Sequence, residues 1–312
     1  MFTRLVALLL ILSCISGSAE PVEPDQSSWS ASVVCALRAA ASLHPDPKVR
    51  NPDYLARNLC GLPFELRDYE SIRAAVTRAP EEYAGYFYVN ARTHYIDDAL
   101  NRAARDGATQ VVILGAGFDS RAYRFASKYP RLRFFEVDLP ATQSRKKELV
   151  RLALGAVPDY VRFVPVDFNS QTLESELPAF GFDSHARTLF ILEGVTMYIE
   201  RSGTEATLAF VRSRSASRSR IVFDYMTREA RESADRRPFG MEVAAKALAE
   251  HGEPLVTGWT QGELAALVRS TGLRMNSDLS SEELGELYLR NARGDLDGRV
   301  LGGNRIVEAE TP

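Results

Sequence analysis

Residues 111–121 read VVILGAGFDSR, an apolar run that ends in a Gly-Ala-Gly turn. Such a run is typical of a buried strand that turns tightly into a helix. Glycine lets the backbone approach a ligand where a side chain would clash, so the turn predicts a ligand site. A tight turn without a ligand would have the same short pattern. The third glycine of a dinucleotide fingerprint is absent, since Ser120 and Arg121 stand near its place, and this favours a ligand without a pyrophosphate.

Further apolar runs on both sides of this turn predict an α/β fold. Strands are expected at residues 110–114, 132–137, 161–166, 188–193, 220–224, 273–277 and 304–308. The first five alternate with helical stretches, which is the pattern of parallel βαβ units with helices on both faces of the sheet. We therefore expect a doubly wound sheet of seven strands.

The chain before the first strand has a helical pattern. Apolar residues recur at helical spacing from Ala31 until the helix breaker Pro45, and further helices are expected at 52–60, 67–78 and 90–106. We expect these helices to form a cap on the sheet. The chain then divides into an apolar leader, a linker, the helical cap and the α/β core, at residues 1–19, 20–30, 31–106 and 107–312.

The first 19 residues resemble a secretory signal peptide. Arg4 precedes an apolar run at residues 5–15, and small residues lead to a potential cleavage site after Ala19. The run is too short to span a bilayer comfortably. A lipid anchor on Cys14 and a stray apolar leader are the alternatives. Membrane association is expected only if the segment is retained.

Composition narrows the classes of partner. The chain has 38 basic and 41 acidic residues, which gives a net charge of -3. It therefore lacks the excess of basic residues that is typical of nucleic-acid-binding proteins. The four histidines are scattered and no CxxC occurs, so no metal site is predicted. Cys35 and Cys60 could pair in an oxidising compartment, or could be small buried residues. We expect a small-molecule or protein substrate.

Ligand-type side chains follow the next three strands. Asp138 lies 23 residues after Gly115, where a carboxylate can accept both ribose hydroxyls of an adenosine. Asp167 and Phe168 follow the third strand and suit an adenine amino group and ring, although Asp167 could instead cap a helix. Glu193 follows the fourth strand. Because parallel strands end at one edge of a sheet, we expect these groups to converge on one crevice.

Five motifs occur in an order and spacing that resemble the leucine carboxyl methyltransferase-like family. They read NARTHYIDD at residues 90–98, LGAGFDSR at 114–121, FEVDLP at 135–140, VDF at 166–168 and LEGVTMY at 192–198. The resemblance is greatest for the bacterial branch of candidate S-adenosylmethionine-dependent methyltransferases and covers about residues 30–278. It implies a class I methyltransferase, Rossmann-like fold with an N-terminal helical cap, and S-adenosylmethionine as the cofactor.

The resemblance also implies roles for individual residues. Arg92 would pair with the methionine carboxylate of the cofactor, which a guanidinium can hold through two parallel hydrogen bonds. Gly115 and Glu193 would contact the same amino-acid part. The other cofactor-binding residues that it implies are Gly117, Asp138 for the ribose, and Asp167 and Phe168 for the adenine. A surface ion pair is the alternative for Arg92.

Methyl transfer depends mainly on positioning and exclusion of water, so no dedicated base is required if the acceptor is a carboxylate. Tyr198 is the residue expected near the transferred methyl group, with Tyr88 and His94 on the cap as further candidates. Packing roles are the alternative for all three. Asn169 departs from the basic residue common in relatives of the carboxyl methyltransferase itself, which puts the acceptor in doubt.

The predicted function is O-methylation of a carboxylate or hydroxyl on a small molecule. Methylation of a protein's C-terminal carboxylate and a catalytically silent cofactor-binding protein are the alternatives. A nicotinamide-dependent oxidoreductase would need a complete GxGxxG motif, which the chain lacks. Because S-adenosylmethionine is made in the cytosol, a cytoplasmic location is expected, with export as the alternative that the leader raises.

Overall fold

The computed structural model describes residues 28–60, 69–167, 171–233 and 236–312. The predicted leader at residues 1–19 and Phe168 lie outside the described residues, as does most of the predicted linker. None of the helices in the described ranges is long and apolar enough to cross a membrane.

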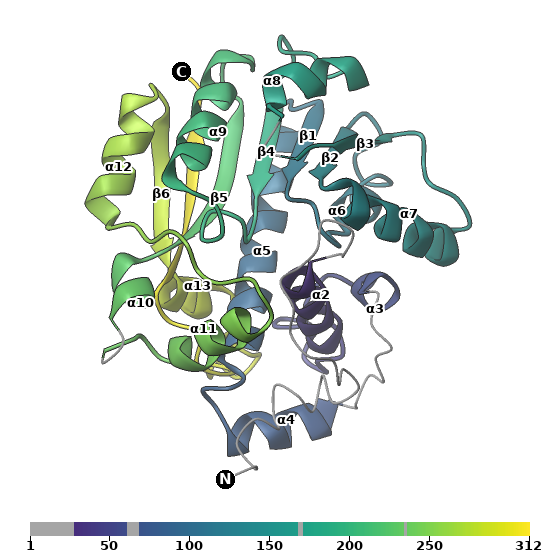
Figure 1. The fold of residues 1–312 in the computed structure, drawn as a ribbon. Helices are drawn as coiled ribbons and strands as arrows, with labels where there is room; N and C mark the ends of the chain where they lie inside the picture. The colour runs from purple at the N-terminus through teal and green to yellow at the C-terminus, as the bar shows by residue number, and fades with distance from the viewer. Residues whose placement is uncertain (1–27, 61–68, 168–170, 234–235) are drawn as a thin grey trace.

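A seven-stranded sheet forms the centre of the molecule (Figure 1). Its strand order is β3-β2-β1-β4-β5-β7-β6, and β7 runs antiparallel to both of its neighbours. The strands are β1 Gln110–Leu114, β2 Arg133–Asp138, β3 Val161–Pro165, β4 Thr188–Leu192, β5 Arg220–Met226, β6 Arg274–Ser280 and β7 Asn304–Glu310. Each predicted strand overlaps an observed one, so the predicted doubly wound seven-stranded sheet is confirmed.

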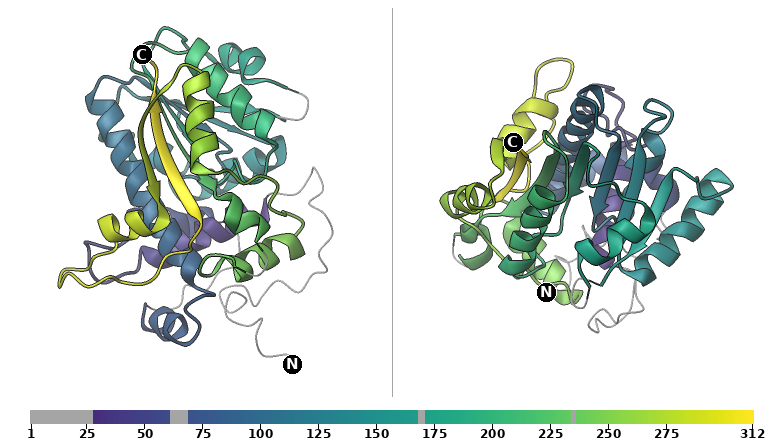
Figure 2. Two further views of the ribbon diagram at one scale, coloured as in Figure 1. Left: turned by 90° about the vertical axis from the view of Figure 1, so that its left-hand side faces the viewer. Right: turned by 90° about the horizontal axis from the view of Figure 1, so that it is seen from above.

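Helices cover both faces of this sheet (Figure 2). Every residue of β1 is buried, because alternate side chains of a strand point to opposite faces. Val111 and Ile113 belong to one core with α5 (Ala84–Arg105) and α7 (Pro140–Leu154). The other core joins Val112 and Leu114 to helices on the opposite face, which are α8 (Leu173–Glu176), α9 (Arg201–Ser213) and α12 (Gln261–Ser270).

A further layer of helices lies below the edge of the sheet at which the parallel strands end (Figure 1). Its helices are α2 Trp29–Ala41, α3 Ala56–Leu59, α4 Tyr69–Arg78, α10 Arg228–Glu232 and α11 Met241–Glu250. The layer therefore combines the predicted N-terminal helices with helices from the C-terminal part of the chain. Three further elements complete the fold, which are α6 Arg121–Arg124, η1 Leu177–Phe180 and α13 Ser281–Tyr288, the last of them packed on α5.

Two N-terminal helices begin earlier than the apolar pattern suggests. The Ser28 side chain accepts a hydrogen bond from the Ala31 N–H at 3.2 Å, so α2 starts at Trp29 rather than Ala31. Helix α5 starts at Ala84 rather than residue 90, and its first two turns are buried. Burial on several sides hides the helical spacing of apolar residues there.

The order of the strands places a crevice between β1 and β4. Strands β2 and β3 lie on one side of β1, whereas β5, β7 and β6 lie beyond β4. Doubly wound sheets bind their ligands outside the carboxyl ends of the strands at such a reversal. The Gly115-Ala116-Gly117 turn follows β1 at this point, and Glu193 follows β4.

Candidate functional site

A cavity of about 720 Å³ opens at this crevice, between the sheet edge and the helices below it. Its volume falls within the roughly 300–1,000 Å³ that is usual for small-molecule sites. Six predicted site residues line it, namely Arg92, Gly115, Gly117, Asp138, Glu193 and Tyr198. Asp167 is not among the lining residues, and Phe168 lies outside the described ranges. Their contact with adenine stays a prediction.

The glycine turn forms a wall of the cavity without side chains. Gly115 has φ 65° and Gly117 has φ 42°, both in the left-handed region that favours glycine. A Cβ atom on Gly115 would lie 2.4 Å from Cγ2 of Val195. The close approach of Val195 and the left-handed backbone both favour glycine here. Glycine puts no side chain between the peptide groups of the turn and the cavity.

Asp138 fixes the glycine turn against β2. Its Oδ2 accepts a hydrogen bond from the Gly117 N–H at 2.5 Å, and its Oδ1 accepts one from the Leu139 N–H at 2.7 Å. Burial raises the pKa of this carboxyl above its ordinary value. An ionised carboxylate has about four lone-pair sites, so it retains capacity to accept hydroxyl donors from a ligand.

Arg92 is held by two carboxylates beside the cavity. Its Nε lies 2.9 Å from Glu193 Oε1, and its Nη1 lies 2.5 Å from Asp224 Oδ2. The guanidinium also lies over the ring of Tyr88, 5.2 Å from the centroid. A guanidinium has five N–H donors, so these contacts leave donors for a ligand carboxylate.

Glu193 is kept ionised by two arginines. Its Oε2 lies 2.6 Å from Arg121 Nη1, and its Oε1 pairs with Arg92. Burial alone would raise the pKa of Glu193, but the two guanidinium groups outweigh burial and hold the pKa far below its usual range. Arg121 is itself buried and also pairs with Asp97 and Asp119. The site therefore rests on a buried network of charges.

Two members of this network, Arg121 and Asp224, were not predicted as site residues. Asp224 accepts hydrogen bonds from the Tyr88 hydroxyl at 3.0 Å and the Gly194 N–H at 2.6 Å, besides its pair with Arg92. Its position near the end of the fifth strand was a usable signal, because the other strand-end acids were predicted on that basis. Arg121 lies within the glycine motif, but no sequence feature showed that it would be buried.

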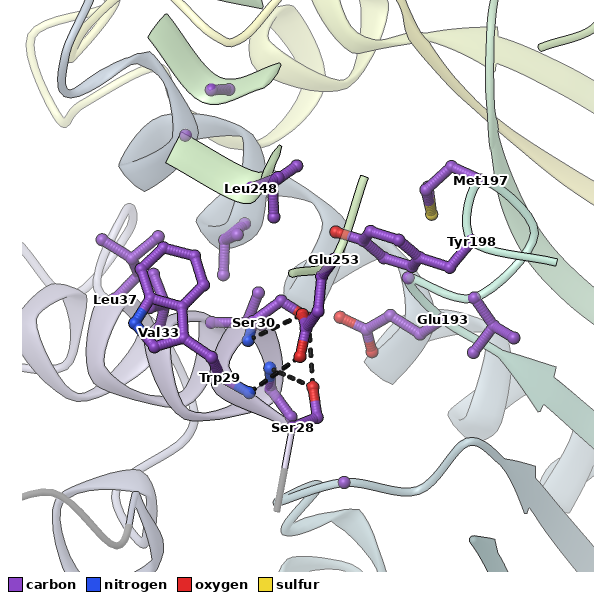
Figure 3. A pocket seen from close by; sticks show the side chains of 18 of the residues that line it. Ser28, Trp29, Ser30, Val33, Leu37, Glu193, Met197, Tyr198, Leu248 and Glu253 are labelled. Atoms are coloured by element: carbon purple, nitrogen blue, oxygen red, sulfur yellow. Dashed lines mark hydrogen bonds between the residues drawn. The ribbon is translucent and has the colours of Figure 1, made fainter. Parts of the chain in front are cut away.

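The three aromatic candidates have different surroundings. Tyr198 lines the cavity, and its hydroxyl points toward Glu253 (Figure 3). Burial and the charge of Glu253 raise the pKa of Tyr198, so it is a hydrogen-bond donor at neutral pH. Tyr88 lines the cavity and donates to Asp224. His94 instead stacks on Tyr288, with ring centroids 5.7 Å apart, and is not a lining residue.

The remaining lining is mainly apolar and comes from helices. We call it the helical part of the cavity; it comprises the lining residues of α2 except Arg38, residues 81–85, α11 and residues 252–256, among them Val33, Leu37 and Met241. Arg38 belongs to the strand-end part, because its guanidinium donates to the Phe118 carbonyl oxygen in the glycine motif at 2.8 Å. Glu253 joins two sides of it, since its carboxylate accepts hydrogen bonds from the N–H groups of Trp29 at 2.9 Å and Ser30 at 3.0 Å (Figure 3).

The side chains of the described ranges form neither a candidate metal site nor a disulfide. No group of three or more His, Cys, Asp or Glu side chains there has an arrangement that could hold a metal ion. Cys35 and Cys60 are both buried and free in the structure.

Comparisons with known proteins agree with the motifs. A family model described as leucine carboxyl methyltransferase matches residues 31–212. YktD of Bacillus subtilis, named as a candidate S-adenosyl-L-methionine-dependent methyltransferase, is 34% identical over 66% of this chain and 67% of its own. A protein of Mycobacterium avium with a similar name is 31% identical over 81% of this chain and 82% of its own.

Among solved structures, a DUF574 family protein of Streptomyces avermitilis has a similar fold. Its TM-score is 0.55 at 15% sequence identity, and the match covers 87% of this chain and 100% of that chain. At this identity the likeness concerns the fold alone.

Proposed function

Since the chain belongs to the leucine carboxyl methyltransferase family and is an S-adenosylmethionine-dependent methyltransferase, we propose that it methylates a hydroxyl oxygen on an apolar small molecule. The family assignment does not specify the methyl acceptor, so the class of acceptor is what we propose here. Its main support is the chemistry of the cavity wall beyond the strand ends.

The residues at the strand ends fit the cofactor. S-adenosylmethionine carries a carboxylate, an ammonium and a sulfonium, so it has a net positive charge. The charged side chains that line this part of the cavity are Arg38, Arg92, Asp119, Asp138 and Glu193. The carboxylates outnumber the guanidinium groups by one, which complements the cofactor. We propose that Arg92 and Glu193 hold its amino-acid part and that Asp138 holds its ribose.

When bound, the cofactor supplies an electrophilic methyl group on its sulfonium. The protein's contribution is to hold an acceptor oxygen in line and to exclude water. Tyr198 has a raised pKa and stays protonated, so we propose that it positions the acceptor by donating a hydrogen bond rather than by taking a proton. The proton that the acceptor hydroxyl loses on methylation passes to the Glu253 carboxylate, which lines the same cavity. Apolar side chains of α2 and α11 keep water from the reacting groups.

The absence of a free cation argues against a carboxylate acceptor. In the described ranges, Arg38 and Arg92 are the cationic side chains that line the cavity. Arg38 Nε lies 2.9 Å from Asp53. Arg92 is held by Glu193 and Asp224, and we propose that its remaining donors hold the carboxylate of the cofactor. A protein's terminal carboxylate would therefore enter an apolar space next to carboxylates. Burying a charge without a partner is costly, whereas a hydroxyl group needs only a hydrogen bond.

Methyl transfer to a matched panel tests this proposal. The full chain is incubated with methyl-labelled S-adenosylmethionine and either hydroxyl-bearing aromatic compounds or peptides with free terminal carboxylates. We expect label on the hydroxyl compounds as ethers, which resist mild alkali. Label that alkali releases from the peptides as methanol would show an ester and would contradict the proposal. Tyr198→Phe should reduce transfer while binding of the cofactor stays unchanged.

A further inference from the structure

The helical part of the cavity carries negative charge and no positive charge among the described residues. Its charged lining residues are Glu81, Glu82 and Glu253. Unlike the strand-end part, where guanidinium groups offset carboxylates, this part has no arginine or lysine on its wall. The charge of the cofactor is already complemented at the strand ends. The three carboxylates therefore act on whatever molecule occupies the rest of the space.

These carboxylates have different environments. Glu81 is exposed to solvent. Glu253 is half-buried, and its two oxygens accept the backbone N–H groups of Trp29 and Ser30. Glu82 is half-buried, and its Oε2 is fully buried without a hydrogen-bond partner in the described ranges. Of the three carboxylates, Glu82 is the one with an oxygen that burial removes from water and to which no described residue gives a hydrogen bond in return.

Glu82 is also held in place by its surroundings. It precedes α5, and the Glu81 carbonyl oxygen would lie 2.9 Å from a Cβ atom on Gly240, just before α11. The starts of α5 and α11 therefore pack closely where Glu82 lines the cavity. Burial raises the pKa of Glu82, and no neighbouring charge contributes to this shift. A positively charged group would supply the missing partner.

We propose that Glu82 binds a protonated amino group on the acceptor, so that the substrate class is an apolar hydroxyl compound that also carries an amine. This inference rests on the proposed function and adds the sign of the acceptor's charge. The apolar walls from α2 and α11 hold the hydrocarbon part, and Glu82 holds the cationic end. Glu82 is thus a specificity-determining residue, and an anionic analogue of the same shape is excluded.

Three phenols of matched size test the charge preference directly. Tyramine is cationic, 4-ethylphenol is neutral and 4-hydroxyphenylacetate is anionic. Their binding is measured by saturation-transfer NMR and calorimetry on the full chain, saturated with S-adenosylhomocysteine, which has no methyl group to transfer. We expect the affinity to fall in the order cation, neutral compound, anion. Equal affinities, or tightest binding of the anion, would overturn the inference.

Two variants test whether Glu82 is the residue responsible for the preference for a cationic ligand. A hydrogen bond to a charged group contributes about 1.5–3 kcal/mol, so Glu82→Gln should weaken tyramine binding roughly tenfold to hundredfold. Binding of 4-ethylphenol should change little. Glu70→Gln removes the same charge from an exposed position of α4 that does not line the cavity, and should leave tyramine binding nearly unchanged. Equal losses in the two variants would contradict a specific role for Glu82.

The experiment separates this inference from the proposed function. If S-adenosylhomocysteine and 4-ethylphenol bind but tyramine has no advantage, the charge preference is wrong and the small-molecule acceptor stands. If S-adenosylhomocysteine binds and none of the three phenols does, the apolar acceptor site is wrong and the inference fails with it. The order of affinities in the unmodified protein decides the question even if Glu82→Gln does not fold.

Discussion

Buried charges define the site at the scale of single residues. Arg121 is 2% exposed and contacts Asp97, Asp119 and Glu193 at 2.5 to 2.7 Å. Removing one partner of a buried ion pair leaves an uncompensated charge, which costs far more than loss of a surface pair. Arg121 acts on the cavity through Glu193, so it is a positioning residue.

Replacing Arg121 should therefore destabilise the protein strongly. We expect Arg121→Met to lower the free energy of unfolding by about 3–5 kcal/mol, measured by urea denaturation. Arg145→Met is the matched control, because Arg145 pairs with Glu148 at 3.1 Å on an exposed helix surface. Such surface pairs contribute about 0–1 kcal/mol. Similar losses in the two variants would contradict the role given to the buried network.

A second buried pair predicts how stability depends on pH. Glu136 Oε2 lies 2.8 Å from Lys146 Nζ, and both side chains are buried. Burial raises the pKa of Glu136 from 4.5 to about 7, although Lys146 opposes the shift. A raised pKa in the folded state means that the contribution of this group to stability is lost as pH rises from 4.5 to about 7.

Removing both charges should remove this part of the pH dependence. We expect Glu136→Met with Lys146→Met to lose less stability than the unmodified protein as pH rises from 4.5 to about 7, measured by urea unfolding. The single variant Lys146→Met should be less stable than the double variant, because it leaves the carboxyl unpaired. Parallel pH profiles for the unmodified and double-variant proteins would show that Glu136 is not the group responsible.

Sequence reasoning found the site residues that carry a local signal. Gly115, Asp138 and Glu193 stand at strand ends, and topology alone brings strand ends together. Arg121 was missed because its role depends on partners from distant segments, whereas Asp224 had the strand-end signal but was not singled out. Glu82 was missed for the same reason as Arg121, since α11 approaches it only in the folded chain.

At the scale of elements, α2 and the segment after α11 close one side of the cavity together. Glu253 caps the start of α2 through two backbone N–H groups, and the ring of Trp29 stacks on His251 at 3.8 Å between centroids. Carboxylates near a helix N-terminus are favourable because the first N–H groups have no partner within the helix.

Breaking this contact should loosen the start of α2. We expect Glu253→Ala to cost about 0.5–2 kcal/mol of stability and to speed amide hydrogen exchange at the first turn of α2. Ser28→Ala is the comparison, since it removes the side-chain hydrogen bonds of Ser28 to the Ala31 N–H and the Ser30 hydroxyl but leaves the link to residue 253 in place. Unchanged exchange at α2 in Glu253→Ala would mean that the cap does not hold the helix.

Elements differed in how well the sequence predicted them. Strands were predicted well because short apolar runs between helices have few other interpretations. The pattern at 241–250 is rich in alanine and helical, but it carries no ligand motif. Only the fold places α11 at the cavity. The assignment of residues 31–106 as a cap remains a prediction, because α5 packs against both α2 and the sheet.

At the scale of the whole molecule, two distant parts of the chain complete one site. Apart from Arg38, the strand-end part of the cavity comes from the centre of the sequence, and the helical part comes from both sides of it. We propose that this division separates binding of the cofactor from choice of the acceptor.

The most direct measurement is calorimetric titration of the full chain with S-adenosylmethionine, alongside Asp138→Ala and the exposed control Asp159→Ala. We predict saturable binding by the unmodified protein and by Asp159→Ala. Asp138→Ala should bind roughly tenfold to hundredfold more weakly, because it removes hydrogen bonds to a charged acceptor of about 1.5–3 kcal/mol. No binding by a natively folded, unmodified chain, or equal binding by all three proteins, would contradict the assignment of this cavity as the cofactor site.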